Sequence, residues 1–159
     1  MDFHPHEYQS IAIQRIIDNT HYGLLLDMGL GKTISTLIAI DRLMYDYFDI
    51  KKVLLIAPKK VAESTWAQES QKWSATRRLT VAKVLGSEKE RIHALESESD
   101  IYVINRENVQ WLYEYYHKKK SFPFDMLVID ESSSFKNPQA KRFKAIRKLR
   151  PLFKRIVIL

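Results

Sequence analysis

Hydrophobic residues along this chain alternate between short apolar runs and longer stretches in which they recur every three or four positions. Short apolar runs are typical of strands buried on both faces, and the longer period is typical of amphipathic helices. The predicted strands cover residues 22–26, 53–57, 80–85, 101–104, 126–129 and 155–159. The predicted helices cover residues 7–19, 32–46, 61–73, 88–96, 108–116 and 138–149, and residues 117–123 are predicted to be irregular. This alternation predicts an α/β fold in one domain, 1–159, whose mainly parallel central sheet is covered by helices on both faces.

A glycine turn between the first predicted strand and the next helix indicates a phosphate-binding loop. Gly29, Gly31, Lys32 and Thr33 occupy this turn. Glycines let backbone N–H groups close around phosphate oxygens, and the positive end of the new helix favours the same anions. Lys32 is expected to reach the outer phosphates, and the Thr33 hydroxyl is expected to bind Mg²⁺. The alternative is a glycine turn that only caps a helix, and Leu26 stands where the usual spacing has a first small residue.

An acidic pair, Asp130 and Glu131, directly follows the apolar run at 126–129. The carboxyl ends of parallel strands carry the chemistry of open α/β sheets. Asp130 can hold Mg²⁺ through water, and Glu131 can orient and deprotonate an attacking water. Many strands end in a solvated carboxylate, so this signal is weak alone. Together with the phosphate loop it predicts an ATP- or GTP-hydrolysing domain.

Composition indicates a globular cytoplasmic protein that binds a polyanion. The chain has 159 residues, 45% of them hydrophobic, with no cysteine for a disulfide or thiolate metal site and no apolar run long enough to span a membrane. The formal net charge is +7, and Glu131 is the last acidic residue. The basic residues after it are Lys136, Lys141, Arg142, Lys144, Arg147, Lys148, Arg150, Lys154 and Arg155. Such one-sided charge is typical of nucleic-acid binding, and a solvated helix face is the alternative.

These segments, taken in order, resemble the first RecA-like lobe of superfamily 2 (DEAD/DEAH-box) helicases. Residues 27–33 resemble the phosphate loop of the Swi/Snf-like branch of double-stranded DNA translocases, and residues 130–137 resemble its acidic box. Phage and bacterial members are the most similar. The resemblance implies a three-layer RecA-like P-loop fold, hydrolysis of ATP with Mg²⁺, and movement along DNA. Ser133 departs from the family pattern, which often has histidine there.

The resemblance also implies a set of nucleotide-binding residues. Gln9 stands at the position where the family has a glutamine that recognises adenine. A carboxamide suits this role, because it can donate to N7 of adenine and accept from N6 in one plane. Met28, Gly29, Leu30 and Gly31 belong to the loop that would hold the nucleotide, together with Lys32 and Thr33. The alternative for Gln9 is an ordinary surface glutamine on the first helix.

Further residues correspond to family segments that contact the DNA backbone. Lys59 and Lys60 follow the second strand, Asn105 and Arg106 follow the fourth, and Lys136 belongs to the acidic box. The alternatives are solvated loop lysines for the first pair and a polar helix start for the second. Trp66 is expected to pack in the core rather than to stack on bases.

The last predicted strand stops at the final residue, which suggests that the chain is a piece of a longer architecture. A second RecA-like lobe, in cis or in trans, would then complete the motor, and the isolated piece would be weakly active. Two other functions stay open. One is a P-loop NTPase or kinase that acts without nucleic acid, and the other is a non-catalytic binding module.

Overall fold

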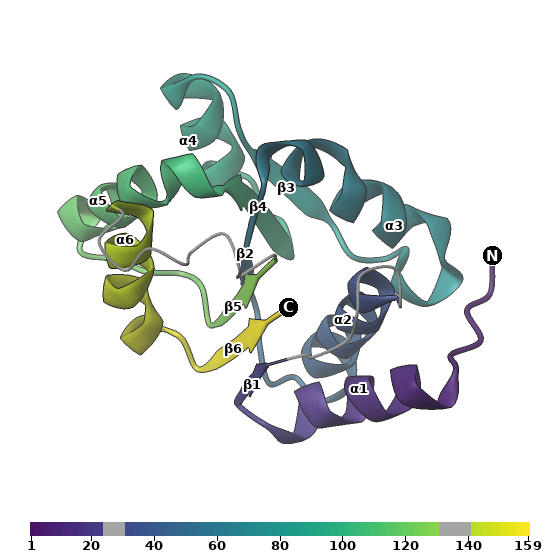
Figure 1. The fold of residues 1–159 in the computed structure, drawn as a ribbon. Coiled ribbons are helices and arrows are strands. Elements are labelled where there is room, and N and C mark those ends of the chain that lie inside the picture. Colours follow the sequence, from purple (N-terminus) through teal and green to yellow (C-terminus); the bar gives the residue numbers. More distant parts are fainter. Residues whose placement is uncertain (24–30, 131–140) are drawn as a thin grey trace.

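Six strands within the described residues form one sheet in which each paired strand is parallel to its neighbour. The computed structural model describes residues 1–23, 31–130 and 141–159 (Figure 1). The strands are β1 (His21–Gly23), β2 (Val53–Ala57), β3 (Val81–Val84), β4 (Ile101–Asn105), β5 (Met126–Ile129) and β6 (Arg155–Ile158). They lie in the order β1-β6-β5-β2-β4-β3. The predicted α/β class and parallel sheet are confirmed.

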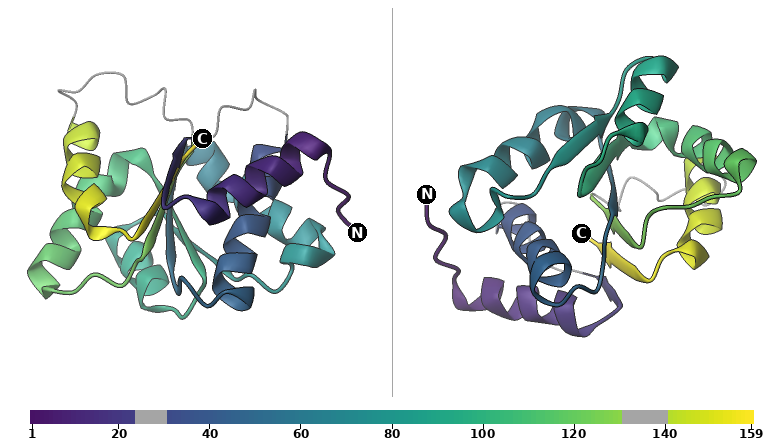
Figure 2. Two further views of the ribbon diagram at one scale, coloured as in Figure 1. Left: turned by 90° about the horizontal axis from the view of Figure 1, so that it is seen from below. Right: turned by 180° about the vertical axis from the view of Figure 1, so that it is seen from behind.

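Helices cover both faces of this sheet, as Figure 2 shows where the strands are seen edge-on. They are α1 (Glu7–Asp18), α2 (Lys32–Asp41), α3 (Trp66–Lys72), α4 (Glu88–Glu96), α5 (Val109–Lys119) and α6 (Lys141–Leu149). Buried side chains of α1, α2 and the segment leading into α3 form one core cluster, and those of α4, α5 and α6 form a second. The sheet therefore separates two cores.

Strand residues alternate between the two cores, as the two-residue period of a strand requires. Leu55 and Val128 belong to the cluster with α1 and α2, whereas Leu54 and Leu127 belong to the cluster with α5 and α6. All four side chains are fully buried. Each such side chain contributes about 1.5–3 kcal/mol of transfer free energy, which explains the continuous apolar runs in the sequence.

Two of the predicted helices contain a π-helical turn. Helix α2 continues into a π-helical turn at Arg42–Asp46, and α3 is preceded by one at Val61–Thr65. The C-terminal end of α2 is fixed by the buried Asp41 carboxylate, which accepts hydrogen bonds from Arg78 Nε at 2.9 Å and Nη2 at 2.7 Å. The predicted phosphate loop therefore lies at the start of a helix whose other end is held in place.

The expectation of an irregular segment at 117–123 is wrong in its first half. Helix α5 continues to Lys119 and ends at Lys120, which has a φ of 53°. The residues beyond it are also packed, because the Phe122 ring contacts the rings of Tyr116 and Phe153 edge-on. The polar lysines concealed this order, since the aromatic residues on either side of them supply the packing.

The register of the strands aligns their carboxyl ends along one edge of the sheet. Ala57 of β2 pairs with Asn105 of β4, and Ile56 pairs with Ile129 of β5. The backbone N–H of Asp130 donates to Ile56 O at 2.8 Å, and that of Leu159 donates to Ile129 O at 2.9 Å. The residues that follow β2, β4 and β5 are therefore held side by side.

An ion-pair cluster at the opposite edge ties the start of β6 to the segment that precedes β2. Asp49 accepts hydrogen bonds from Lys154 Nζ at 2.5 Å and Arg155 Nε at 2.6 Å. The hydrogen bond from Lys154 is the main reason that the pKa of Asp49 lies below its ordinary value of 3.8, and Arg155 lowers this pKa further against the opposing effect of burial.

We predict that Asp49→Asn lowers the free energy of unfolding by about 1–2 kcal/mol, because Arg155, whose side chain is 11% exposed, loses its charged partner. A lowered folded pKa means that this stabilisation is complete above pH 3.8, the unfolded value, and is lost as the pH falls through the folded pKa. Urea unfolding of both proteins from pH 7 to pH 2.5 measures the difference. Asp46→Asn is the control, because the Asp46 side chain is 59% exposed and its pair with Arg78 is long at 3.7 Å. A difference for Asp49→Asn that is as large at the lowest pH as at pH 7 would contradict this account.

Candidate nucleotide-binding site

Helix α2 begins at the position expected for a phosphate loop. Gly31 is its N-cap residue and has φ 77° and ψ 31°, a left-handed conformation that glycine adopts without strain. Its carbonyl accepts the hydrogen bond from Ser35 N at 3.0 Å that starts the helix. Lys32 and Thr33 form the first turn and are partly exposed. The N–H groups of this first turn have no partner within the helix itself, which makes its N-terminus suited to an anion.

Gln9 lies against this turn rather than on the open surface. Its side chain is only 6% exposed, and its Oε1 accepts a hydrogen bond from His6 N at 2.9 Å. A Cβ atom added at Gly31 would overlap Gln9 Nε2. The structure therefore brings together the predicted adenine reader and the end of the predicted phosphate loop, and the alternative of an ordinary surface glutamine is wrong.

Asp130 follows β5 at the carboxyl edge of the sheet and takes part in a hydrogen bond that the sequence did not suggest. Its Oδ2 accepts from Trp66 Nε1 at 3.0 Å. Trp66 is fully buried in the core cluster of α1 and α2, so it packs as expected. The alternation along β5 offers a signal for this contact, because Asp130 falls on the same face as Val128, the face that α3 covers.

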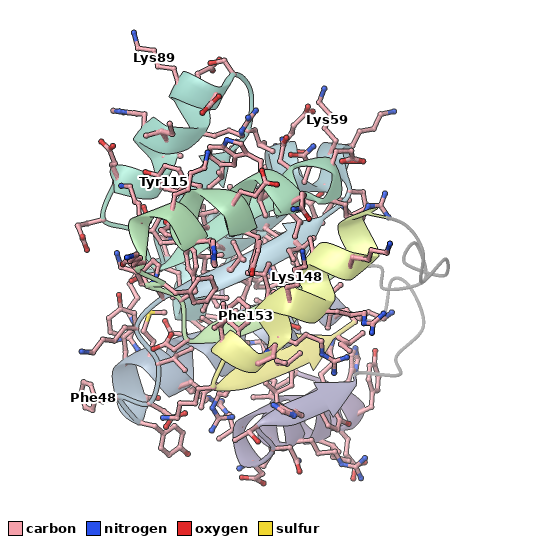
Figure 3. The ribbon with its side chains drawn as sticks, turned by 90° about the vertical axis from the view of Figure 1, so that its left-hand side faces the viewer. Phe48, Lys59, Lys89, Tyr115, Lys148 and Phe153 are labelled. Carbon is pink, nitrogen blue, oxygen red and sulfur yellow. The ribbon has the colours of Figure 1, made fainter. Side chains whose placement is uncertain are left out.

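The predicted nucleic-acid residues of two strands lie at the same edge. Lys59 and Lys60 follow β2 and are exposed, and Figure 3 shows Lys59 extending outward from the ribbon. Asn105 is 7% exposed; its amide nitrogen donates to Glu107 Oε2 at 3.0 Å, and its Oδ1 accepts from Asn108 Nδ2 at 2.7 Å. Asn105 thus shapes the turn after β4. Arg106 as a residue is partly exposed, but its Nε and Nη1 atoms are buried and have no hydrogen-bond partner among the described residues.

Several expected site residues lie outside the described part of the chain. They are Met28, Gly29, Leu30, Glu131 and Lys136. The described residues hold no group of three or more His, Cys, Asp or Glu side chains that could bind a metal ion. Thr33 and Asp130 each carry an oxygen of the kind that binds Mg²⁺ together with water and phosphate oxygens. No helix among residues 1–23, 31–130 and 141–159 is long and apolar enough to cross a membrane.

Comparison with protein families matches residues 8–158 to the SNF2-related domain. The chain belongs to this family. As an SNF2-related domain it falls in a class of ATPase domains, and the predicted Swi/Snf-like resemblance is confirmed. Among curated relatives, it is 35% identical over 136 residues to putative protein p41 of Acyrthosiphon pisum secondary endosymbiont phage 1. It is 33% identical over 143 residues to the nuclear protein STH1/NPS1 of Saccharomyces cerevisiae.

Solved structures share the fold of this SNF2-related domain. The SWI2/SNF2 ATPase core of Sulfolobus solfataricus, solved in complex with double-stranded DNA, matches 100% of the chain with a TM-score of 0.78 and 22% identity. The UvsW helicase of bacteriophage T4 matches 99% of the chain with a TM-score of 0.74 and 18% identity. The expected RecA-like architecture is confirmed.

The SNF2-related domain spans only part of these proteins. The phage match covers 85% of this chain and 29% of p41, and the yeast match covers 85% of this chain and 10% of STH1/NPS1. The structural matches cover 32% of the Sulfolobus chain and 52% of UvsW.

We predict that Gly31→Ala impairs both stability and nucleotide binding. The positive φ costs an alanine about 1–2 kcal/mol, and the new Cβ displaces the Gln9 carboxamide. Gly86→Ala is the matched control, since Gly86 has a similar φ of +86° but its Cβ would meet only the flexible Glu90 carboxylate at 2.9 Å. Urea unfolding and calorimetric titration with ATP measure the two effects. Equal ATP affinity in the two variants would refute the role of the Gln9–Gly31 contact.

Proposed function

We propose that this chain is the ATP-binding motor lobe of a DNA-dependent ATPase that hydrolyses Mg²⁺-ATP to move along double-stranded DNA. The observation that carries this proposal is the shared position of the α2 N-terminus and Asp130. Both follow strands at the carboxyl edge of one parallel sheet, and both lie on the face covered by α1 and α2. That arrangement is the common nucleotide-binding geometry of open α/β folds.

The residues at this edge fit Mg²⁺-ATP. The first turn of α2 offers backbone N–H groups and the Lys32 ammonium to phosphate oxygens, and Gln9 lies close enough to the turn to read an adenine beside it. The Thr33 hydroxyl and the Asp130 carboxylate have the oxygen chemistry that Mg²⁺ prefers. Bound ATP supplies the phosphoanhydride bond whose hydrolysis releases free energy.

The chain's own groups then divide the remaining work. Lys32 balances negative charge that develops on the outer phosphates, and Asp130 would hold a magnesium ion through water. Glu131 orients the attacking water and accepts its proton. A carboxylate suits that task because it accepts hydrogen bonds and can take up a proton.

Duplex DNA is proposed to contact the same edge of the sheet. Lys59 and Lys60 are exposed directly after β2, and Arg106 follows the neighbouring strand β4, so their charges can follow one phosphate backbone. Asn105 supports this surface through its bonds to Glu107 and Asn108, and Lys136 is proposed to add a further contact. Support also comes from the relatives, one of which is named a chromatin remodeling factor and another a DNA repair and recombination protein.

A second RecA-like lobe, in cis or in trans, is proposed to complete the site. The chain matches 32% of the length of the Sulfolobus ATPase core. An arginine supplied across two lobes contributes about a thousandfold or more to phosphoryl transfer. We therefore expect this chain alone to bind Mg²⁺-ATP and to hydrolyse it slowly.

We predict that Lys32→Ala lowers ATP turnover about a hundredfold or more in a protein that joins this chain to a second lobe, because one charge-stabilising group is lost. The measurement is phosphate release with and without duplex DNA, beside calorimetric ATP binding by the chain alone. Lys89→Ala is the control, since Lys89 is exposed on α4, which packs on the face of the sheet opposite α2, and its side chain extends outward (Figure 3). Turnover that DNA does not raise would favour a P-loop enzyme that acts without nucleic acid, and absent ATP binding would favour a binding module.

We predict that Lys59→Gln/Lys60→Gln weakens duplex binding and lowers the slope of log K against log salt by about 2, one unit for each lost phosphate contact. Lys51→Gln/Lys52→Gln is a matched control at the other end of the same strand, β2. Fluorescence anisotropy with a labelled duplex between 50 and 200 mM salt, roughly the range over which such binding changes most, measures both slopes. Equal slopes in the two double variants would exclude Lys59 and Lys60 from the DNA contact.

A further inference from the structure

The indole of Trp66 does more than fill the core. Its side chain is 0% exposed, and its Nε1–H donates to Asp130 Oδ2 at 3.0 Å. A buried indole N–H needs an acceptor, and a carboxylate is a strong one because the hydrogen bond is charge-assisted. The core thus contributes one polar contact directly to the edge where the nucleotide is proposed to bind.

Asp130 is held at two points by different parts of the fold. Its backbone N–H donates to Ile56 O at 2.8 Å, which fixes its Cα beside β2. The bond from Trp66 acts on the side chain, where it restricts rotation of the carboxylate about the Cβ–Cγ bond. The sheet therefore sets the position of this residue, and α3 sets the direction of its oxygens.

We propose that Trp66 is a positioning residue for the magnesium ligand Asp130. This inference rests on the proposed function, because it requires that Asp130 holds the Mg²⁺ of the bound nucleotide. Groups that orient a metal-binding side chain commonly change metal affinity or activity by about 10- to 100-fold when they are removed. A rotationally fixed carboxylate is ready for the ion, whereas a free one must be ordered on binding.

The helix that carries Trp66 also carries the proposed DNA contacts. Residues 59–72 are helical without a break, through the π-helical turn Val61–Thr65 and into α3. Lys59 and Lys60 lie at its start, and the rise of a helix places them about 10 Å along the axis from Trp66. Because one continuous helix joins both points, DNA bound at Lys59 and Lys60 is expected to alter the environment of the Trp66 indole.

The first test removes the donor and keeps an aromatic ring. Trp66→Phe is expected to weaken Mg²⁺-dependent ADP binding on the order of tenfold and to leave binding in EDTA unchanged. Trp73→Phe is the matched control, because the Trp73 indole donates to Glu69 Oε1 at 2.9 Å within the same segment, away from the site. Calorimetric titration of the chain with ADP, with Mg²⁺ or with EDTA, measures the difference. Equal loss in both buffers would assign Trp66 a structural role and overturn the proposal.

The second test needs no substitution, so it holds even where Trp66→Phe does not fold. The chain has three tryptophans, and each indole N–H gives its own signal in a ¹⁵N–¹H correlation spectrum. The Trp66 signal is expected to shift when Mg²⁺ is added to the ADP complex and again when a short duplex is added, while the Trp73 signal stays in place. A Trp66 signal that does not shift on addition of Mg²⁺ would overturn the positioning role. A signal that shifts with Mg²⁺ but not with the duplex would overturn only the link to DNA.

These outcomes are distinct from failure of the proposed function. If the unsubstituted chain does not bind ADP with Mg²⁺, the nucleotide proposal fails and the role of Trp66 fails with it. If the chain binds ADP with Mg²⁺ and Trp66→Phe binds it equally well, only the positioning role is overturned.

Discussion

In-register pairing of parallel strands is the constraint on which the rest of this structure depends. Because β2 pairs with both β4 and β5, the residues that leave these three strands emerge at one edge. No long-range interaction between Asp130 and Lys59 is needed to bring them near each other. The backbone hydrogen bonds between the strands bring these residues together. The helices cover both faces of the sheet with apolar side chains, which exclude water from these hydrogen bonds.

Much of the fold could be predicted from the sequence. Burial on both faces of a parallel sheet produces continuous apolar runs in the strands, and these runs stand out from the helical pattern between them. The helix at 88–96 was predicted with the bounds that the structure has, and the structure adds that Ser87 caps it by accepting from Glu90 N at 3.2 Å. The end of α5 could not be predicted in this way. Lysines at 118–120 suggested a loop, and the packing of the segment that follows α5 includes a contact between Phe122 and Phe153, which is distant in sequence.

The candidate site likewise contains residues that local sequence patterns predict and contacts that they do not. Short local patterns were sufficient to predict Gly31, Lys32 and Asp130 as site residues. A glycine turn, or an apolar run followed by a charged residue, can be recognised within a few positions of the sequence. The contacts of Gln9 with Gly31 and of Trp66 with Asp130 join segments far apart in the chain. A pattern can show that such residues are buried or capped, but only the packing of α1 and α3 decides what their polar atoms meet.

The π-helical turn ahead of α3 has a consequence for how this site could have arisen. A turn of this kind accommodates one extra residue, and each residue rotates a helix by about 100°. The turn Val61–Thr65 lies directly before Trp66, so it determines which side chain of α3 faces β5. A one-residue insertion or deletion that this turn did not absorb would rotate α3 by about 100° and turn a different residue toward the carboxylate. The length of this short segment therefore contributes, with the identity of residue 66, to the choice of the chemical group that Asp130 meets.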